Sequence, residues 1–326
     1  MAEESSYINH DYRRCSGKHA IGNQTFDLCI SAYGRLRRIA ELMVGRIGRF
    51  ISVGGAPAYR GYMNPALFKP PGLPVPTSEE APLVEVEQED VKGWRIVQTE
   101  EIVFKYHPTA THFRYPFVYG PYQLLPREWC VVRRILDKRP HIIVPDDGLI
   151  MYTFGYAGNL AHAVLLAVDK PEKSAGQVFN CGDERVLSLR QVIEIISSAL
   201  EHEWEIISMP SQLAIPARPM MMQPVTTHRI LNIAKIQREL GYHDVVDPAD
   251  ALTHTAKWLV DHPPKTGGQE ETLLQDPFDY HAEDQLIVAW KKLTKSMPKI
   301  TFKQEPGFGV YYSGPGGRYK SSDQFK

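Results

Sequence analysis

Short apolar runs alternate with amphipathic stretches along the first part of the chain. The runs at 26–31 and 49–53 have the length of buried strands, and both end close to glycine residues. Between them, apolar residues recur at helical spacing over 35–45. The order strand, helix, strand predicts two parallel strands joined by a right-handed crossover.

A further predicted strand begins at Thr111, follows a predicted helix over 94–106, and is closed by Gly-Pro at 120–121. A central strand does not continue through proline, so the chain turns there. In open α/β sheets, ligands bind beyond the carboxyl ends of the strands. We therefore expect this stretch to line a pocket, and a core strand with an ordinary turn is an equally good interpretation. The pocket residues would be Tyr115, Pro116 and Tyr119.

The alternation continues to about residue 259 and predicts a mixed α/β protein. Helices are expected over 129–136, 156–169, from 188 to 199, in a segment ending at 240, over 248–259 and over 284–293. Strands are expected over 141–144, 177–180 and 204–209. Ser188 is the expected N-cap of its helix.

Residues 56–92 interrupt this alternation with an irregular insert. Six prolines fall between Pro65 and Pro82, and an acidic run covers 85–90. Long irregular segments inside compact domains are usually functional lids or disordered regions. The first 25 residues are polar and lack periodicity, so we expect a poorly ordered leader.

The composition is that of an ordinary globular protein, with 43% hydrophobic and 23% charged residues among 326. The formal net charge of −1 argues against nucleic-acid and anionic-membrane partners. No secretory signal and no run long enough for a membrane span is found, so a cytoplasmic location is expected. No grouping has metal-ligand spacing. The four cysteines show no CxxC spacing: Cys15, Cys29, Cys130 and Cys181. Three of them lie in or beside apolar runs and are expected to be reduced, buried thiols.

Four segments in order resemble the extended short-chain dehydrogenase/reductases, the group of NAD(P)-dependent epimerases and dehydratases. The strand end at 114–121 is similar to the family's Arg-Pro-x-x-x-Tyr-Gly-Pro, and 155–163 to the start of its following helix. The segments 179–189 and 240–242 resemble its Tyr-Asn-x-Gly and Leu-Gly-Tyr segments. The resemblance covers about 26–259 and implies an oxidoreductase or isomerase acting on a small molecule.

The resemblance also implies the fold and its divisions. It indicates an α/β fold with an N-terminally shortened, Rossmann-like parallel sheet and a smaller C-terminal α/β substrate domain. The expected divisions are a leader (1–25), a partial Rossmann-like domain (26–122), substrate-domain elements with returning Rossmann segments (123–262) and a C-terminal extension (263–326). The shortened sheet would have an unpaired edge that a second subunit or the chain's own tail must cover. We therefore expect a homodimer or a tail wrapped over this edge.

Two features of the family are missing from this sequence. No Gly-x-x-Gly-x-x-Gly loop precedes Phe26, so the strand there resembles the family's fourth strand. The proton-exchanging Tyr-x-x-x-Lys pair is replaced by Trp94 and Gln98, and Ser52 stands one turn position too early for the family's Ser/Thr. The resemblance thus implies NAD or NADP as a cofactor, while the missing loop and pair make that cofactor doubtful.

The insert supplies candidate replacements for the missing proton donors. Tyr59 matches the family's substrate-side tyrosine, and a neighbouring arginine can lower the pKa of a tyrosine. The alternative is a purely structural role, in which the tyrosine side chains only fill the interior of the insert. The candidate catalytic residues are Tyr59, Tyr62 and Arg60.

Further contacts are implied by the resemblance alone. Cofactor contacts are implied at Tyr33, Gly34, Ser52, Gly54, Tyr115, Pro116 and Val118. Substrate contacts are implied at Tyr119, Arg127, Tyr156 and Asn159. His112, which alternates with Phe113 on its strand, is expected to be a satisfied polar core or edge residue.

Three functions fit these observations. A family enzyme predicts saturable binding of NAD(H) or NADP(H). A cofactor-independent isomerase, lyase or cyclase predicts turnover without nicotinamide that is lost in Tyr59→Phe or Tyr62→Phe. A degenerate binding protein predicts neither activity nor cofactor binding.

Overall fold

The computed structural model describes residues 21–223 and 225–307. Contacts divide the chain into two compact units, Met1–Phe278 and Asp279–Lys326. The second unit contains helix α12 (Tyr280–Lys295), as predicted from its periodicity. The expected leader up to residue 20 and the tail from 308 lie outside the described residues.

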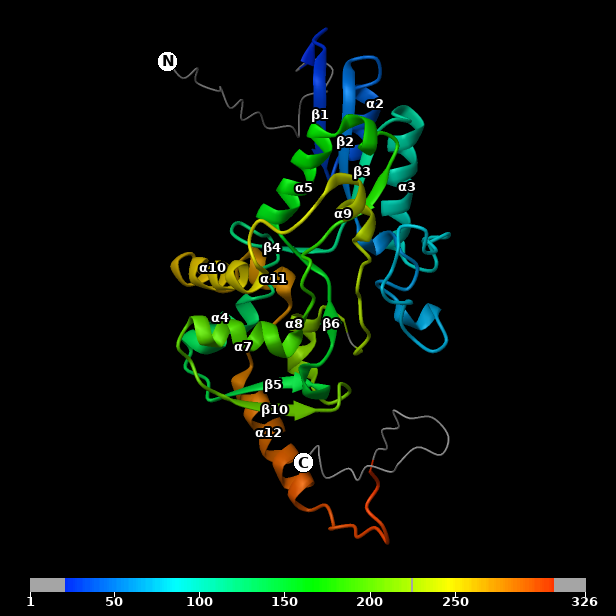
Figure 1. Ribbon diagram of the computed structural model, residues 1–326. Helices are drawn as coiled ribbons and strands as arrows, with labels where there is room; N and C mark the ends of the chain where they lie inside the picture. The colour runs from blue at the N-terminus through cyan, green and yellow to red at the C-terminus, as the bar shows by residue number, and fades with distance from the viewer. Residues whose placement is uncertain (1–20, 224, 308–326) are drawn as a thin grey trace, which may run out of the picture. The chain divides into compact units, whose positions relative to one another are not determined.

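A parallel four-stranded sheet forms the centre of the first unit (Figure 1). Its spatial order is β1 (Phe26–Ala32), β2 (Ile47–Gly55), β3 (Thr111–Tyr115) and β8 (Val178–Asn180). All three strand pairings are parallel. The predicted α/β class with a parallel sheet is confirmed.

Helices cover both faces of this sheet (Figure 1). They are α2 (Leu36–Leu42) and α3 (Val91–Tyr106) on one face, and α5 (Ala157–Asp169) and α9 (Ala234–Leu240) on the other. Successive side chains of a strand point to opposite faces, and β2 shows why both faces are apolar. Phe50 packs with α2 and α3, whereas Ile51 packs with α5 and α9. The sheet is therefore buried on both sides, as parallel sheets are.

Shorter strand pairs and further helices extend the first unit. The pairs are β4 (Phe117–Tyr119) with β7 (Phe154–Tyr156), β5 (His141–Pro145) with β10 (Glu205–Met209), and β6 (Met151–Tyr152) with β9 (Leu187–Ser188). Of these three pairs, β6 with β9 is antiparallel and the other two are parallel. The helices are α4 (Trp129–Leu136), α6 (Pro171–Ser174), α7 (Leu189–Ala199), α8 (Arg218–Met221), α10 (Pro248–Asp261) and α11 (Gln269–Leu274).

The start of α7 confirms the predicted N-cap. The Ser188 hydroxyl accepts a hydrogen bond from the Gln191 backbone N–H at 3.2 Å. The Gln191 side chain in turn accepts one from the Ser188 backbone N–H at 2.9 Å, which completes a capping box. Two N–H groups at this helix start are thereby satisfied.

The insert at 56–92 packs against the rest of the first unit, so its interpretation as a disordered segment is wrong. Its prolines remove backbone donors, and it forms only short 3₁₀ turns, η1 (Ala56–Ala58) and η2 (Pro65–Leu67). Tyr62 and Leu73 of the insert are buried with Leu231. Thr77 is held at both ends of its peptide, donating to Ile230 O at 2.7 Å and accepting from Asn232 N–H at 2.8 Å.

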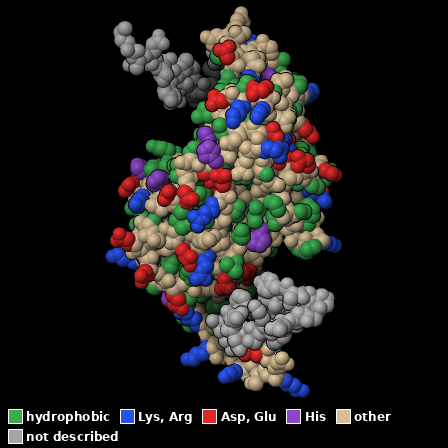
Figure 2. Space-filling model, in the orientation of Figure 1, with side chains coloured by type: hydrophobic (Ala, Val, Ile, Leu, Met, Phe, Trp, Pro, Cys, Tyr) green, Lys and Arg blue, Asp and Glu red, His purple; other side chains and the backbone are tan. Residues whose placement is uncertain are grey.

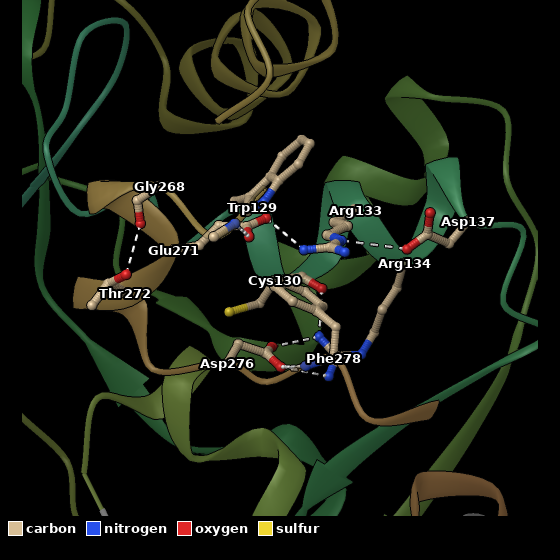
Figure 3. Close-up of polar contacts among 11 residues, drawn as sticks. Trp129, Cys130, Arg133, Arg134, Asp137, Gly268, Glu271, Thr272, Asp276 and Phe278 are labelled. Atoms are coloured by element: carbon tan, nitrogen blue, oxygen red, sulfur yellow. Dashed lines mark hydrogen bonds and ion pairs between the residues drawn. The ribbon is translucent and has the colours of Figure 1, made fainter. Parts of the chain in front are cut away.

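Helix α11 and the segment that follows it are fastened to α4 by ion pairs (Figure 3). Glu271 of α11 accepts a hydrogen bond from the Trp129 indole N–H at 3.0 Å and contacts Arg133 at 2.5 Å. Arg134 Nη1 lies 2.7 Å from Asp276 Oδ2, and both side chains are buried. We call this set of contacts the α4–α11 clasp. It brings the segment up to Phe278 into the first unit.

Candidate functional site

A cavity of about 1130 Å³ opens at the carboxyl ends of β1, β2 and β3. The ends of these strands form its floor, with Gly34 following β1, Gly54 near the end of β2 and Tyr115 at the end of β3. Walls come from α3, from the insert and from the residues before α4. The cavity therefore lies where an open parallel sheet is expected to bind its ligand.

The cavity collects most of the residues implied as cofactor contacts. Those that line it are Tyr33, Gly34, Gly54, Tyr115, Pro116 and Val118. Ser52, the remaining member of that set, is fully buried below the floor and bonds to His112. Of the expected substrate contacts, Arg127 lines the cavity.

The other implied substrate contacts gather elsewhere, around Asp183. The Tyr119 hydroxyl donates to Asp183 Oδ2 at 2.9 Å. The Tyr156 backbone N–H and the Asn159 amide both donate to Asp183 Oδ1, at 3.0 and 3.1 Å. Burial raises the pKa of Asp183, and these donors oppose that rise. The arrangement satisfies a buried carboxylate, and a substrate role for Tyr119, Tyr156 and Asn159 stays a prediction.

Tyr59 does not have the lowered pKa of a catalytic acid or base that its sequence position suggested. Its side chain is 1% exposed, and its hydroxyl donates to Asn180 Oδ1 at 2.6 Å and accepts from Arg114 Nη1 at 3.0 Å. Burial raises its pKa to about 12, although Arg114 opposes the rise. The expected lowering by Arg60 is wrong because Arg60 is turned to Glu89, with Nε 2.7 Å from Oε1.

Tyr62 is the candidate catalytic residue that does line the cavity. It is buried in the insert's cluster. Burial raises its pKa to about 12, against the positive charges of Arg229 and Arg127. A phenol in this state is a proton donor rather than a base at neutral pH.

A polar network that was not predicted from the sequence reaches the cavity at His112, which is one of the lining residues. Ser52 Oγ lies 2.7 Å from His112 Nδ1, and Arg114 forms a paired contact with Glu100 at 2.6 and 3.0 Å. His112 Nε2 lies 3.4 Å from Glu100 Oε2 and has no hydrogen-bond partner among the described residues, so the expectation of a satisfied histidine is wrong. Burial lowers the His112 pKa to about 4, which keeps the ring neutral.

A signal for this network was present in the sequence. His112 and Arg114 alternate on β3, and Ser52 and Gly54 occupy the matching register positions on β2. Alternate residues of a strand share one face, so these four lie together on the α3 side. A Cβ at Gly54 would lie 2.5 Å from His112 Nε2, which explains the glycine. The partner Glu100 comes from a helix and could not be placed from the strand pattern.

The outer rim of the cavity is rich in cations. The lining includes Arg35, Arg37, Arg38, Lys92 and Arg95. It also includes two carboxylates, Glu128 and Glu87, and Glu87 lies 3.9 Å from Arg95. On the face that Figure 2 shows, acidic and basic side chains are interspersed. The rim therefore favours an anionic ligand.

Within residues 21–223 and 225–307, no histidine, cysteine and carboxylate side chains come together as a metal-binding group. No helix in this part of the chain has the length and apolarity to cross a membrane. The described cysteines, Cys29, Cys130 and Cys181, are free thiols.

Comparisons with known proteins agree with this geometry. Residues 97–182 match the model of the NAD dependent epimerase/dehydratase family. The chain is 26% identical over 159 residues to the uncharacterized protein YbjS of Escherichia coli strain K12, covering 42% of this chain and 47% of that protein. It is 30% identical over 83 residues to UDP-D-apiose/UDP-D-xylose synthase 1 of Arabidopsis thaliana, covering 25% and 21%. The chain thus matches less than half the length of these curated relatives.

Solved structures extend the similarity to the fold. UDP-glucuronic acid 4-epimerase from Bacillus cereus in complex with NAD matches with a TM-score of 0.52 and 16% identity, over 70% of this chain and 66% of that one. Pal from Bacillus thuringiensis matches with a TM-score of 0.54 and 17% identity, over 75% and 79%. The resemblance to the NAD-dependent epimerase/dehydratase family is therefore confirmed, by sequence over residues 97–182 and by fold over most of the chain.

Proposed function

We propose that this chain is an NAD(P)-dependent enzyme of the epimerase/dehydratase type that acts on an anionic small molecule in the cavity. The supporting observation is that residues from three consecutive strand ends, with Gly34, Gly54 and Tyr115 among them, line one cavity. The match of residues 97–182 to the family model includes the β3 end that contributes to this floor.

The residues of the cavity suit the nicotinamide end of such a cofactor. When bound, NAD(P) supplies a group that accepts and returns a hydride. Gly54 and Gly55 allow a planar ring close to the backbone, and Tyr33 and Tyr115 offer aromatic and apolar surface beside it. The cationic rim suits the phosphates of the cofactor, because clustered positive charges attract anions.

Proton handling must differ from that of the family, because α3 carries Trp94 and Gln98 in place of its Tyr and Lys. Trp94 lines the cavity but cannot exchange a proton. Tyr62 lines it as well and is the candidate donor, so our proposal assigns it the proton-transfer role. Tyr59 and Arg60 are not among the residues that line the cavity, and a catalytic role for them stays a prediction.

The absence of the family's Tyr and Lys pair also supports a second candidate function. An enzyme without the Tyr and Lys pair can be a cofactor-independent isomerase, lyase or cyclase that uses the same cavity. A third candidate, a binding protein without catalysis, differs from both because it predicts no turnover.

Titration with NAD(H) and NADP(H), followed by calorimetry or nicotinamide fluorescence, tests the proposal. Saturable binding is expected, and it should weaken at least about tenfold in a Lys92→Glu, Arg95→Glu double variant, because two rim cations are reversed. Arg190→Glu is the matched control, since Arg190 is exposed on α7 outside the cavity and should leave binding unchanged. If neither cofactor binds at millimolar concentration, the proposed dehydrogenase function is wrong. The cofactor-independent enzyme and the binding protein without catalysis then remain as candidates.

A further inference from the structure

The cations at the cavity rim come from two neighbouring helices. Arg35, Arg37 and Arg38 lie at the start of α2. Lys92 and Arg95 lie in the first two turns of α3. The two helices pack against each other on one face of the sheet, through a shared apolar cluster (Figure 1). The rim is therefore part of the central fold of the first unit.

Arg37 ties the two helices together at the rim. Its Nε donates to Thr99 Oγ1 at 2.8 Å, and its Nη2 donates to the backbone oxygen of Arg95 at 2.6 Å. The Thr99 hydroxyl donates to the same Arg95 oxygen at 2.7 Å. One rim cation is thereby held in place, and the backbone that carries a second is bonded to it. Groups that are fixed before a ligand arrives lose less entropy when it binds.

The protein neutralises these cations poorly. The side chains of Arg38 and Lys92 form no ion pair with any described residue, and the contact of Arg95 with Glu87 is 3.9 Å long. Asp90 is the N-cap of α3, where its Oδ1 accepts from the Lys92 backbone N–H at 2.9 Å, and it does not line the cavity. Like charges gathered at one cavity repel each other, so the arrangement is most favourable with an anion bound.

The cavity lining carries a surplus of positive charge. Glu128, one of its two carboxylates, is paired with Arg127 at 2.7 Å, which offsets one charge of each sign. Even with Arg35 left out of the count, four rim cations then face only Glu87, a surplus of three. The pyrophosphate of NADH carries about two negative charges, one on each phosphate. A phosphate monoester adds about 1.5–2 more at neutral pH, so a ligand with both groups uses the whole surplus.

We propose that the rim holds a phosphate monoester as well as a pyrophosphate, so that the cavity selects NADP(H) over NAD(H). Arginine binds a phosphate through two parallel N–H bonds and lysine binds it as a point charge, so Arg38 and Lys92 are the selecting residues. The nicotinamide would lie at the strand ends and the phosphates towards the rim. The inference rests on the proposed function and names the form of its cofactor.

The first test compares the Kd values of NADPH and NADH for the full chain, by nicotinamide fluorescence at about 50 mM salt. NADPH is expected to bind at least about tenfold more tightly, because it neutralises more of the rim. The ratio of the two Kd values should shrink as salt is added, since exposed charges are screened. Equal Kd values at low salt overturn the proposal.

Nucleotide fragments test the second phosphate without any nicotinamide. Calorimetry compares 2′,5′-ADP, which carries the two phosphate positions of the adenosine half of NADP(H), with 5′-AMP and 3′,5′-ADP. We expect 2′,5′-ADP to bind more tightly than either. Binding of 5′-AMP as tight as that of 2′,5′-ADP overturns the proposal. The isomer 3′,5′-ADP has the same charge, so binding at least as tight as that of 2′,5′-ADP overturns the choice of NADP(H).

An Arg38→Gln, Lys92→Gln double variant tests the selecting residues. It should weaken NADPH binding at least about tenfold and NADH binding less than about threefold, so that selectivity is lost. Both side chains are exposed, so the melting temperature should stay that of the wild type. Arg190→Gln is the matched control, because Arg190 is exposed on α7 outside the cavity and should leave the selectivity unchanged. Selectivity retained in the double variant overturns the assignment.

This proposal and the proposed function fail in different ways. If 2′,5′-ADP binds through Arg38 and Lys92 but neither NADH nor NADPH binds, the phosphate subsite stands and the dehydrogenase function is wrong. If NADH and NADPH bind equally well, the proposed function stands and the selectivity is wrong.

Discussion

Gly54 and His112 are close neighbours in the lining of the cavity. A Cβ at position 54 would lie 2.5 Å from His112 Nε2 and 2.8 Å from Cε1. The imidazole is fully buried and held by Ser52, so it has little freedom to withdraw. Because Gly54 has no side chain, there is room at this position for the His112 ring and its polar network.

Gly54→Ala is therefore expected to lower the free energy of unfolding by about 1–3 kcal/mol, as overpacked cores do. Urea unfolding measures this change. The matched control is the same substitution in a His112→Ala background, where the cost should largely disappear because the ring is absent. Equal costs in both backgrounds would contradict the steric explanation.

His112 also predicts a pH dependence of stability. Burial lowers its pKa in the folded state to about 4, from 6.5 in the unfolded chain. The unfolded state binds the proton first, so this contribution is present above about pH 6.5 and is lost as the pH falls to about 4. The wild type should lose about 3 kcal/mol more than His112→Asn between pH 7 and pH 4, by urea unfolding at each pH. Parallel losses in the two proteins would show that other groups cause the dependence.

Sequence reasoning located the floor of the site but not its charge network. Tyr115 was expected there because strand ends bind ligands, and Gly54 because the family resemblance implies a cofactor contact; both line the cavity. Tyr59 was misjudged because its partners are Asn180 and Arg114, far along the chain.

At the scale of elements, periodicity was a good guide wherever side chains determine the packing. Helix α4 begins and ends at the predicted residues, Trp129 and Leu136, because its apolar face meets the core. The insert at 56–92 was harder to predict, since its prolines suppress both periodicities and its packing depends on contacts with distant segments such as that at Leu231. Tertiary contacts, not local preference, order it.

The N-cap of α7 gives a test at this scale. Ser188→Ala should lower the free energy of unfolding by about 1 kcal/mol because the Gln191 N–H loses its acceptor. Chemical denaturation measures the change. Ser188→Asp is the control, because aspartate also caps helices and should retain most of the stability. A Ser188→Asp variant as unstable as Ser188→Ala would contradict the capping role.

The α4–α11 clasp gives a second test. Asp276→Ala leaves Arg134 buried without its partner, so we expect a loss of about 3–5 kcal/mol in urea unfolding. An Arg134→Met, Asp276→Leu double variant should recover most of that loss, since both charges are then removed. Failure of the double variant to recover would point to packing rather than charge as the main contribution.

At the scale of the whole molecule, β1 forms one edge of the sheet as described. It exposes apolar side chains, with Phe26 39% and Ile30 50% exposed. Edge strands with apolar residues tend to pair or to be covered. Our prediction of a homodimer, or of a covering tail, rests on this strand.

Sedimentation or light scattering checks the dimer. Ile30→Lys should shift the protein towards monomer, because a charge on an edge strand opposes pairing. Leu149→Lys is the control, since Leu149 is 60% exposed and lies away from β1. A wild type that is monomeric at high concentration would rule out the homodimer.

The clasp between α4 and α11 also determines where the chain can be cut. A fragment that ends near 262, after α10, would lack Glu271 and Asp276 and would leave Arg133 and Arg134 without these acceptors. Limited proteolysis should therefore spare the segment up to Phe278 and cleave after it, because the division between the two units lies there. The smallest fragment that keeps the cavity intact is expected to end close to Phe278, about one helix beyond the last segment that resembles the family.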